Sequence, residues 1–184
     1  MIVKSRNVSV KIDIDNTFTL DSTDNRPCDV ILNPCNYKRG DFYHVLFILI
    51  TSAENEISLA LIGDYYSSDS ECAVLEKDIL TVLQNQTITQ INIDDGSIVK
   101  HIELNGIGCN FGIYKVEKGY VIYGEEEITM LNFNFEKMWS FSGKDIFVSA
   151  SGKTPFEIKE NIIHLYDFEN NYYEIDFNGN VVLS

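Results

Sequence analysis

The chain has 184 residues and a net charge of −14, with 45% hydrophobic and 23% charged residues. This balance is typical of a globular domain with a buried core and excludes an intrinsically disordered chain. The excess of acidic over basic residues, 28 against 14, repels phosphate groups, so we expect neither nucleic acid nor an anionic membrane as a partner.

The cellular compartment is predicted from the first residues, which mix charge and polarity where an export signal has an apolar run. The longest apolar stretch, residues 45–50, is far shorter than the ~20 residues that cross a bilayer and is typical of a buried strand. We therefore expect a soluble, cytoplasmic protein. Its cysteines should then be reduced, mostly buried and free of metal. They are Cys28, Cys35, Cys72 and Cys109.

Strands and turns are predicted along the chain, beginning with a leading hairpin over residues 8–20. Its segment IDIDNTFTL, at 12–20, alternates apolar and polar residues on both sides of an Asp-Asn turn. Asn, Asp and Gly tolerate the positive φ of tight turns, so such a segment predicts two antiparallel strands. Related segments recur as INIDDGSIV at 91–99, LNFNFEKMW at 131–139 and IDFNGNVV at 175–182.

A second turn pattern precedes each of the three later hairpins. It reads LEKDI at 75–79, VEKGY at 116–120 and IKENI at 158–162, with spacings of 41 and 42 residues, and YKRG at 37–40 is an earlier member. The two patterns together predict one all-β repeat domain over residues 1–184, built from four-stranded antiparallel units about 40 residues long. The leading hairpin at 8–20 precedes units at 37–62, 72–104, 111–141 and 155–183.

This four-stranded unit resembles the blade of a β-propeller. The hairpin pattern I-x-I-D-x-G-x-I is similar to blades of the quinoprotein type, whereas Trp139 is followed by Ser140 and not by the Asp of a tryptophan–aspartate repeat. Four blades and one hairpin imply a short or incomplete propeller. Two alternatives remain: a plain β-sandwich, which also alternates, and a helix over residues 70–83.

Catalytic, cofactor and metal motifs are incomplete, so we expect a non-enzymatic protein without cofactor or metal. Residues 152–154 resemble the end of a phosphate-binding loop, but Phe147 replaces its first glycine. The glycine-rich segment 106–112 leads into a predicted strand and not into the helix that would hold a pyrophosphate. The histidines and cysteines have no metal-ligand spacing, no cysteine has a neighbouring histidine, and the acidic turn at 94–96 lacks the distal glutamate of a calcium loop.

Two acidic segments are the candidate partner-binding sites. They lie within residues 45–130, which hold fourteen acidic and four basic groups, a net charge of −10. One is the loop 64–71, where tyrosines beside acids offer contact area at low entropic cost, and the other is a hairpin tip at 125–127. The predicted contact residues are Asp64, Tyr65, Tyr66, Asp69, Glu71, Glu125, Glu126 and Glu127. We expect them to form one contiguous negative patch, with YDFENNYYE at 166–174 as the alternative site.

A small, acidic chain without catalytic motifs resembles the immunity proteins that neutralise bacterial toxins, many of which are basic nucleases. This resemblance implies a monomeric protein that blocks a cognate toxin by direct binding. Two other functions remain open. One is a propeller scaffold or sensor module that binds another host protein, and the other is a lectin-like or hydrolytic small propeller.

Overall fold

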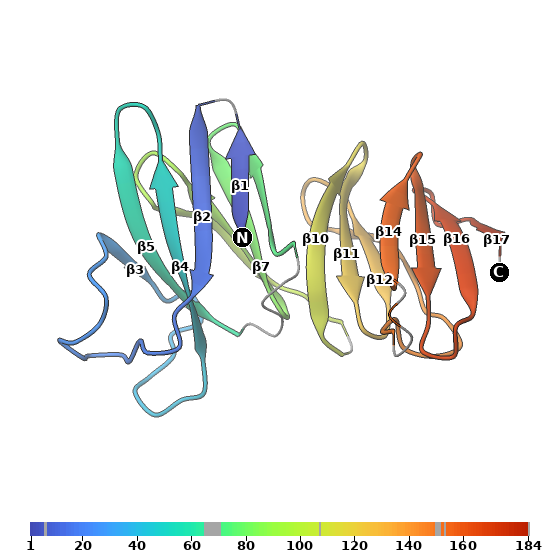
Figure 1. Cartoon of the computed structure of the whole chain (residues 1–184), viewed down its shortest axis with the longest axis horizontal. Helices are drawn as coiled ribbons and strands as arrows, with labels where there is room; N and C mark the ends of the chain where they lie inside the picture. The colour runs from blue at the N-terminus through green and yellow to red at the C-terminus, as the bar shows by residue number, and fades with distance from the viewer. Residues whose placement is uncertain (6, 65–70, 107, 150–151, 153, 184) are drawn as a thin grey trace. The chain divides into compact units, whose positions relative to one another are not determined.

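The computed structural model describes residues 1–5, 7–64, 71–106, 108–149, 152 and 154–183, and none of these lies in a helix. This part of the chain accordingly offers no helix with the length and apolarity needed to cross a membrane. The strands form four sheets, which belong to two compact units, Met1–Leu104 (unit 1) and Asn105–Ser184 (unit 2) (Figure 1). The predicted all-β class is confirmed.

Unit 1 begins with a five-stranded sheet, sheet A, whose strands lie in the order β1-β2-β4-β5-β3. All neighbours in it are antiparallel except β3 and β5, which are parallel. The strands are β1 Ile2–Ser5, β2 Val8–Ile14, β3 Val30–Leu32, β4 His44–Thr51 and β5 Glu56–Gly63.

The structure corrects the prediction of a hairpin over residues 8–20. Strand β2 occupies Val8–Ile14, and its partners are β1 before it and β4 after it, so residues 15–20 do not return as a strand. Instead, the Asp15 carboxylate accepts hydrogen bonds from the amides of Thr17 (2.9 Å) and Phe18 (3.1 Å). This turn directs the buried Phe18 side chain onto the outer face of sheet A.

The unit predicted over residues 37–62 also differs from the structure. Residues 37–40 form a loop turn, in which the Lys38 amide donates to Asp41 Oδ2 at 2.6 Å, and no strand pair flanks it. The hairpin of this region joins β4 and β5, and both strands belong to the same sheet as β1 and β2. The strands found within 8–20 and 37–62 therefore belong to one sheet.

Three later sheets are four-stranded antiparallel meanders with the strands in chain order. Sheet B consists of β6 Ala73–Glu76, β7 Ile79–Gln84, β8 Thr87–Asn92 and β9 Ile98–Glu103. Sheet C consists of β10 Asn110–Val116, β11 Gly119–Gly124, β12 Ile128–Leu131 and β13 Lys137–Phe141. Sheet D consists of β14 Phe156–Lys159, β15 Ile162–Tyr166, β16 Tyr172–Asp176 and β17 Val181–Leu183.

The repeat extends to the irregularities of these sheets. In each meander the register between the third and fourth strands shifts shortly before the turn, at Gln90/Ile91, Met130/Leu131 and Glu174/Ile175. Each repeat also keeps its four strands in one sheet, as a propeller blade does and as a sandwich with strands exchanged between sheets does not. The blade prediction is confirmed, and β6 and β7 stand where a helix over residues 70–83 was the alternative.

Each unit has its own hydrophobic core. In unit 1, side chains of sheets A and B pack together, with Ile48, Leu59, Leu80 and Ile91 at 0% exposure. In unit 2, sheets C and D share a second core rich in aromatic rings. The outer face of sheet A has a separate small cluster, which the segment between β2 and β4 covers with Leu20, Cys28, Tyr37 and Tyr43 in addition to Phe18.

Candidate functional site

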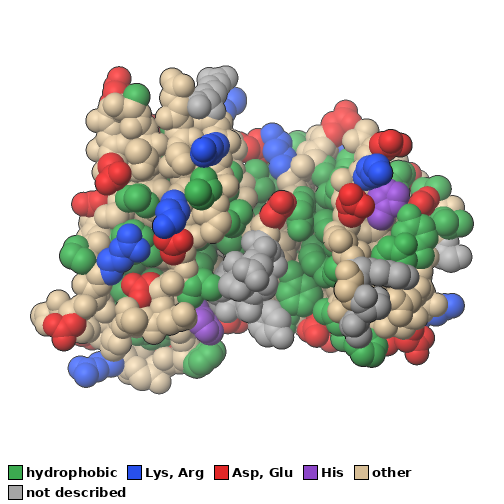
Figure 2. Space-filling view, in the orientation of Figure 1, with side chains coloured by type: hydrophobic (Ala, Val, Ile, Leu, Met, Phe, Trp, Pro, Cys, Tyr) green, Lys and Arg blue, Asp and Glu red, His purple; other side chains and the backbone are tan. Residues whose placement is uncertain are grey.

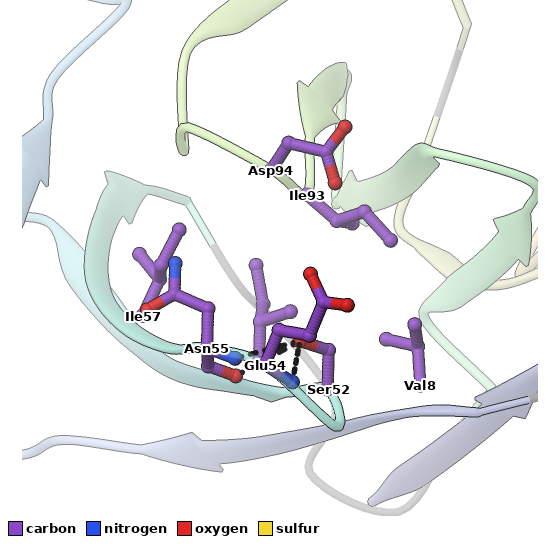
Figure 3. Close-up of a pocket in the computed structure, with 8 residues that line it drawn as sticks. Val8, Ser52, Glu54, Asn55, Ile57, Ile93 and Asp94 are labelled. Carbon is purple, nitrogen blue, oxygen red and sulfur yellow. Dashed lines mark hydrogen bonds between the residues drawn. The ribbon is translucent and has the colours of Figure 1, made fainter.

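A pocket of about 130 Å³ opens in unit 1 where two turns meet, one from sheet A and one from sheet B (Figure 3). Its apolar lining comes from the start of β2, both strands of the β4–β5 hairpin and the residue that follows β8. The lining residues are Val8, Ile50, Ile57 and Ile93, with Ser52, Glu54, Asn55 and Asp94 as the polar ones.

Glu54 owes its place at the rim to the tight turn between β4 and β5. The Ser52 amide donates to the carbonyl of Asn55 at 2.9 Å. The Ser52 hydroxyl in turn accepts hydrogen bonds from the amides of Glu54 (3.3 Å) and Asn55 (3.0 Å). These bonds hold the backbone of the turn, and the exposed Glu54 side chain projects from it.

Asp94 lies in the turn between β8 and β9, where Asn92 is the organising residue. Asn92 Oδ1 accepts the Asp94 amide at 2.8 Å, and the Asn92 carbonyl accepts the amide of Gly96 at 2.9 Å. Asp95 Oδ1 accepts both the amide and the hydroxyl of Ser97, and these bonds lower the pKa of Asp95. The acidic turn is thus held by its own side chains, while the Asp94 carboxyl stays exposed.

The carboxyl groups of Glu54 and Asp94 both point into the pocket in Figure 3. The apolar part of the lining includes Ile50 and Ile93, which are 3% and 6% exposed. Two carboxylates that line one pocket favour a cation inside it. A lysine or arginine side chain suits such a pocket, because its apolar stem can pack on the apolar lining while its charged head reaches the carboxylates.

The predicted loop 64–71 is described only at its ends. Asp64 is half-buried, and its Oδ2 accepts a hydrogen bond of 2.7 Å from Asn85 Nδ2. Glu71 is exposed. Tyr65, Tyr66 and Asp69 lie outside the described residues. Asp64 therefore has a structural partner within unit 1, and of the two described residues Glu71 is the more accessible to a partner protein.

The predicted tip 125–127 lies between β11 and β12, as expected, but its three glutamates differ. Glu126 is exposed, whereas Glu125 and Glu127 are half-buried. The Glu127 carboxylate pairs with Lys137 Nζ at 3.2 Å, so its charge is already partly neutralised within sheet C. The backbone of Glu125 is also tied down, because its carbonyl accepts the Phe147 amide at 2.6 Å.

These two predicted segments belong to different units, Asp64 and Glu71 to unit 1 and the glutamates to unit 2. The single contiguous patch that contains both stays a prediction. On the face seen in Figure 2, acidic side chains are scattered over both units, with basic and uncharged surface among them.

One cysteine–histidine pair was missed in the sequence, where no cysteine adjoins a histidine. Cys35 Sγ lies 3.5 Å from His101 Nε2, and His101 Nδ1 lies 3.0 Å from the hydroxyl of the buried Thr89. Burial raises the pKa of the Cys35 thiol, with a further contribution from Glu103, and burial lowers the pKa of His101. Both directions favour a neutral thiol and a neutral imidazole over the ion pair of an activated nucleophile.

The expectation of mostly buried cysteines is corrected. All four are thiols outside any disulfide, but only Cys72 is fully buried, and Cys28, Cys35 and Cys109 are half-buried. Cys28 and Cys35 lie in the long segments that cover sheet A and not in its strands, so packing leaves them partly accessible. Within the described ranges, no three His, Cys, Asp or Glu side chains are arranged to hold a metal ion.

The pocket carboxylates were also missed as a pair. The turn at 94–96 was considered for its chemistry, whereas nothing in the sequence drew attention to Glu54. The two residues are forty positions apart, and they line one pocket because sheets A and B share a core. Alternation within each strand indicates which face is buried but not which turns of different sheets end side by side.

Comparisons with known proteins assign no family to this chain. No protein-family model matches the sequence, and no curated protein matches it. The structure of BamB from Moraxella catarrhalis is similar at a TM-score of 0.48 and 13% identity, over 77% of this chain and 45% of that one. The structure of Kluyvelomyces marxianus Hsv2 is similar at a TM-score of 0.47 and 7% identity, over 76% of this chain and 46% of that one. The chain spans less than half the length of either structure.

Proposed function

We propose that this chain is a non-enzymatic protein-binding domain whose partner is a basic protein. The observation that carries the proposal is the pocket of unit 1, where the carboxyl groups of Glu54 and Asp94 point into a space that apolar side chains also line. At about 130 Å³ it is smaller than the ~300–1,000 Å³ of pockets for drug-sized ligands, and it suits one side chain of a larger partner.

The charge of the whole chain supports the same partner class. Residues 1–104 hold sixteen acidic and eight basic groups, a net charge of −8, and residues 105–184 hold twelve and six, a net charge of −6. A surface of one sign steers an oppositely charged protein toward it and raises the association rate, most strongly at low salt. Glu71 and Glu126, both exposed, add acidic contacts outside the pocket.

In its specific form, the proposal is that the partner is a bacterial toxin and the chain its immunity protein. Small size, acidic charge and incomplete catalytic motifs support this form. The alternative is a scaffold or sensor module that docks through apolar surface. Salt separates the two, because charge-driven binding weakens steeply as ionic strength rises and apolar docking does not.

The test starts with capture of partners from the native cell by the full chain, followed by affinity measurement with the purified partner. We expect a partner of basic isoelectric point and an affinity that falls at least tenfold between 50 and 300 mM NaCl, as for charge-steered complexes. Replacing Glu54 by Gln together with Asp94 by Asn should lower the affinity, because both changes keep shape and remove charge.

A matched variant, Glu71→Gln together with Glu126→Gln, removes the same two charges outside the pocket. A larger loss of affinity in the pocket variant supports the pocket as the binding site. A larger loss of affinity in the matched variant indicates that the partner binds at the predicted acidic segments instead. A neutral or acidic partner whose affinity is insensitive to salt would overturn the proposal. For the immunity form, expression of the chain should protect cells from the captured partner.

A further inference from the structure

The outward face of sheet D contains a second cluster of aromatic and acidic side chains. Phe156, Leu165 and Tyr173 lie opposite one another across β14, β15 and β16 and belong to the core of unit 2. Successive residues of a strand point to opposite faces. The neighbouring cross-strand row, Glu157, His164 and Glu174, therefore lies on the outward face.

Two tyrosines extend this row along the same face, since Tyr166 pairs with Tyr172 across β15 and β16. Their ring centroids are 4.8 Å apart, and the ring of His164 is stacked on Tyr172 with 18° between the planes. We call Glu157, His164, Tyr166, Tyr172 and Glu174 the Tyr–Glu face. In Figure 2 the surface over sheet D has acidic, hydrophobic and histidine side chains close together.

Hydrogen bonds hold the central part of the Tyr–Glu face in one arrangement. The Tyr172 hydroxyl donates its single proton to Glu174 Oε1 at 2.7 Å, so toward His164 Nδ1, 2.6 Å away, it acts as acceptor. In this arrangement Nδ1 of His164 carries a proton. The bond to Glu174 is also the main reason that the pKa of Tyr172 is raised to about 12.

The side chains of His164 and Glu174 are 23% and 26% exposed, and Glu157 is exposed. The face therefore presents aromatic rings, carboxylates and an imidazole ring to an incoming group. Among the described strand residues of sheet D, Lys159 is the basic residue on the outward face. It lies in the next cross-strand row, which also contains Asp176. Rings attract cations over their faces, and carboxylates accept charged N–H donors.

We propose that the Tyr–Glu face binds an arginine side chain of a basic partner protein. A guanidinium group stacks on tyrosine rings and donates planar pairs of hydrogen bonds to a carboxylate, which a compact ammonium group does less well. Exposed Phe168, at 48%, adds apolar contact at the turn after Tyr166. This inference rests on the proposed function, because it names a contact for the same class of partner.

The experiment is an NMR titration of the ¹⁵N-labelled full chain with the capped peptide Gly-Ser-Arg-Ser-Gly. Analogues with lysine and with the neutral isostere citrulline serve as controls. We expect the largest shifts at amides of β15 and β16 and an affinity in the millimolar range. The lysine peptide should bind about two- to fivefold more weakly, and the citrulline peptide should cause no localised shifts.

Two variants locate the contact. Glu174→Gln should weaken the arginine peptide about two- to fivefold, the range for an exposed charge pair, and Tyr166→Leu should weaken it similarly without a change in charge. The control Glu117→Gln removes one exposed charge at the β10–β11 turn and should have no effect. The comparison of the arginine and citrulline peptides uses the wild-type chain alone. It therefore still tests the inference if a variant does not fold.

Shifts spread evenly over the surface, equal binding of arginine and lysine peptides, or a site away from sheet D would each overturn the inference. These outcomes are separable from the proposed function. A basic partner that still binds with salt-sensitive affinity would keep the function while the Tyr–Glu face is discarded. An acidic or neutral partner would discard the function while peptide binding at the face stands.

Discussion

Three hairpin turns have an Asn or Asp at the same position, at the end of the third strand of a meander. In each, the side-chain oxygen accepts the amide two residues later, at 2.8 Å for Asn92, Asn132 and Asp176 alike. This local hydrogen bond satisfies a backbone amide that has no hydrogen-bond partner on a neighbouring strand in the turn. The Asn and Asp residues of the repeat are therefore explained by turn geometry and not by a ligand.

Asp176 should make stability depend on pH in a way that Asn at the same position does not. Hydrogen bonds from Asn180, and then from Asn178, lower the pKa of Asp176 to about 2. A group with a lowered pKa stabilises the fold above its ordinary value of 3.8 and loses this contribution as pH falls toward 2. We expect Asp176→Asn to lose less stability than wild type between pH 4 and pH 2, measured by thermal melts.

The comparison with Asp176→Ala provides the control, because alanine removes the acceptor as well as the charge. The Asp176→Asn variant retains one acceptor oxygen, of the kind that Asn132 uses in sheet C. Asp176→Ala should thus melt below both other proteins at pH 7. Equal melting temperatures for all three proteins at pH 7 would contradict the assigned role of this side chain.

Cys35 should react slowly in spite of its contact with His101. Burial raises the pKa of the thiol, so less thiolate is present at pH 8 than in an unperturbed cysteine. We expect iodoacetamide to alkylate Cys35 more slowly than free glutathione at pH 8, with the rate followed by mass spectrometry of its peptide. His101→Ala should change this rate by no more than about twofold, since the neutral pair does not activate the thiol. A rate above that of glutathione that depends on His101 would identify an activated nucleophile.

At the scale of elements, the turn between β10 and β11 depends on Gly119. Its φ is +149°, and a Cβ atom there would lie 2.0 Å from the carbonyl oxygen of Leu131 in β12. The backbone can relieve this clash only if strands β11 and β12 move apart. We expect Gly119→Ala to lower the free energy of unfolding by about 3 kcal/mol or more, measured by urea denaturation.

The matched control is Gly40→Ala. Gly40 also has a positive φ, +97°, but a Cβ atom there would meet nothing within 4 Å. Its cost is backbone strain alone, about 1 kcal/mol. If the two variants are equally stable, the close approach of β11 and β12 at Gly119 does not limit the fold.

At the scale of the whole molecule, repulsion among acidic groups should oppose folding at low salt. The chain has 28 acidic and 14 basic residues, and both units are negative. Screening by salt weakens repulsion between charges farther apart than about 10 Å at 0.1 M. We expect the melting temperature to rise by a few degrees between 10 and 200 mM NaCl at pH 7. A fall over the same range would show that ion pairs such as Glu127 with Lys137 outweigh the repulsion.

The strands of sheets B, C and D follow from local sequence patterns. Their hairpins join strands that follow one another in the chain. The alternation of apolar and polar residues and the turn residues at 75–79, 91–99 and 175–182 therefore indicate which strands pair. The same local patterns also predicted the tip at 125–127. These predictions succeeded because a hairpin depends on residues that are close in the sequence.

Pairings and contacts between distant residues depend instead on tertiary packing. Strand β3 pairs in parallel with β5, Cys35 contacts His101 across 66 positions, and Glu54 and Asp94 line the same pocket. The alternation of apolar and polar residues indicates that a strand has a buried face. Two such faces can pack in many ways that bury a similar apolar area. Side-chain packing between sheets A and B selects one of them, and it thereby places the carboxyl groups that the proposed function requires.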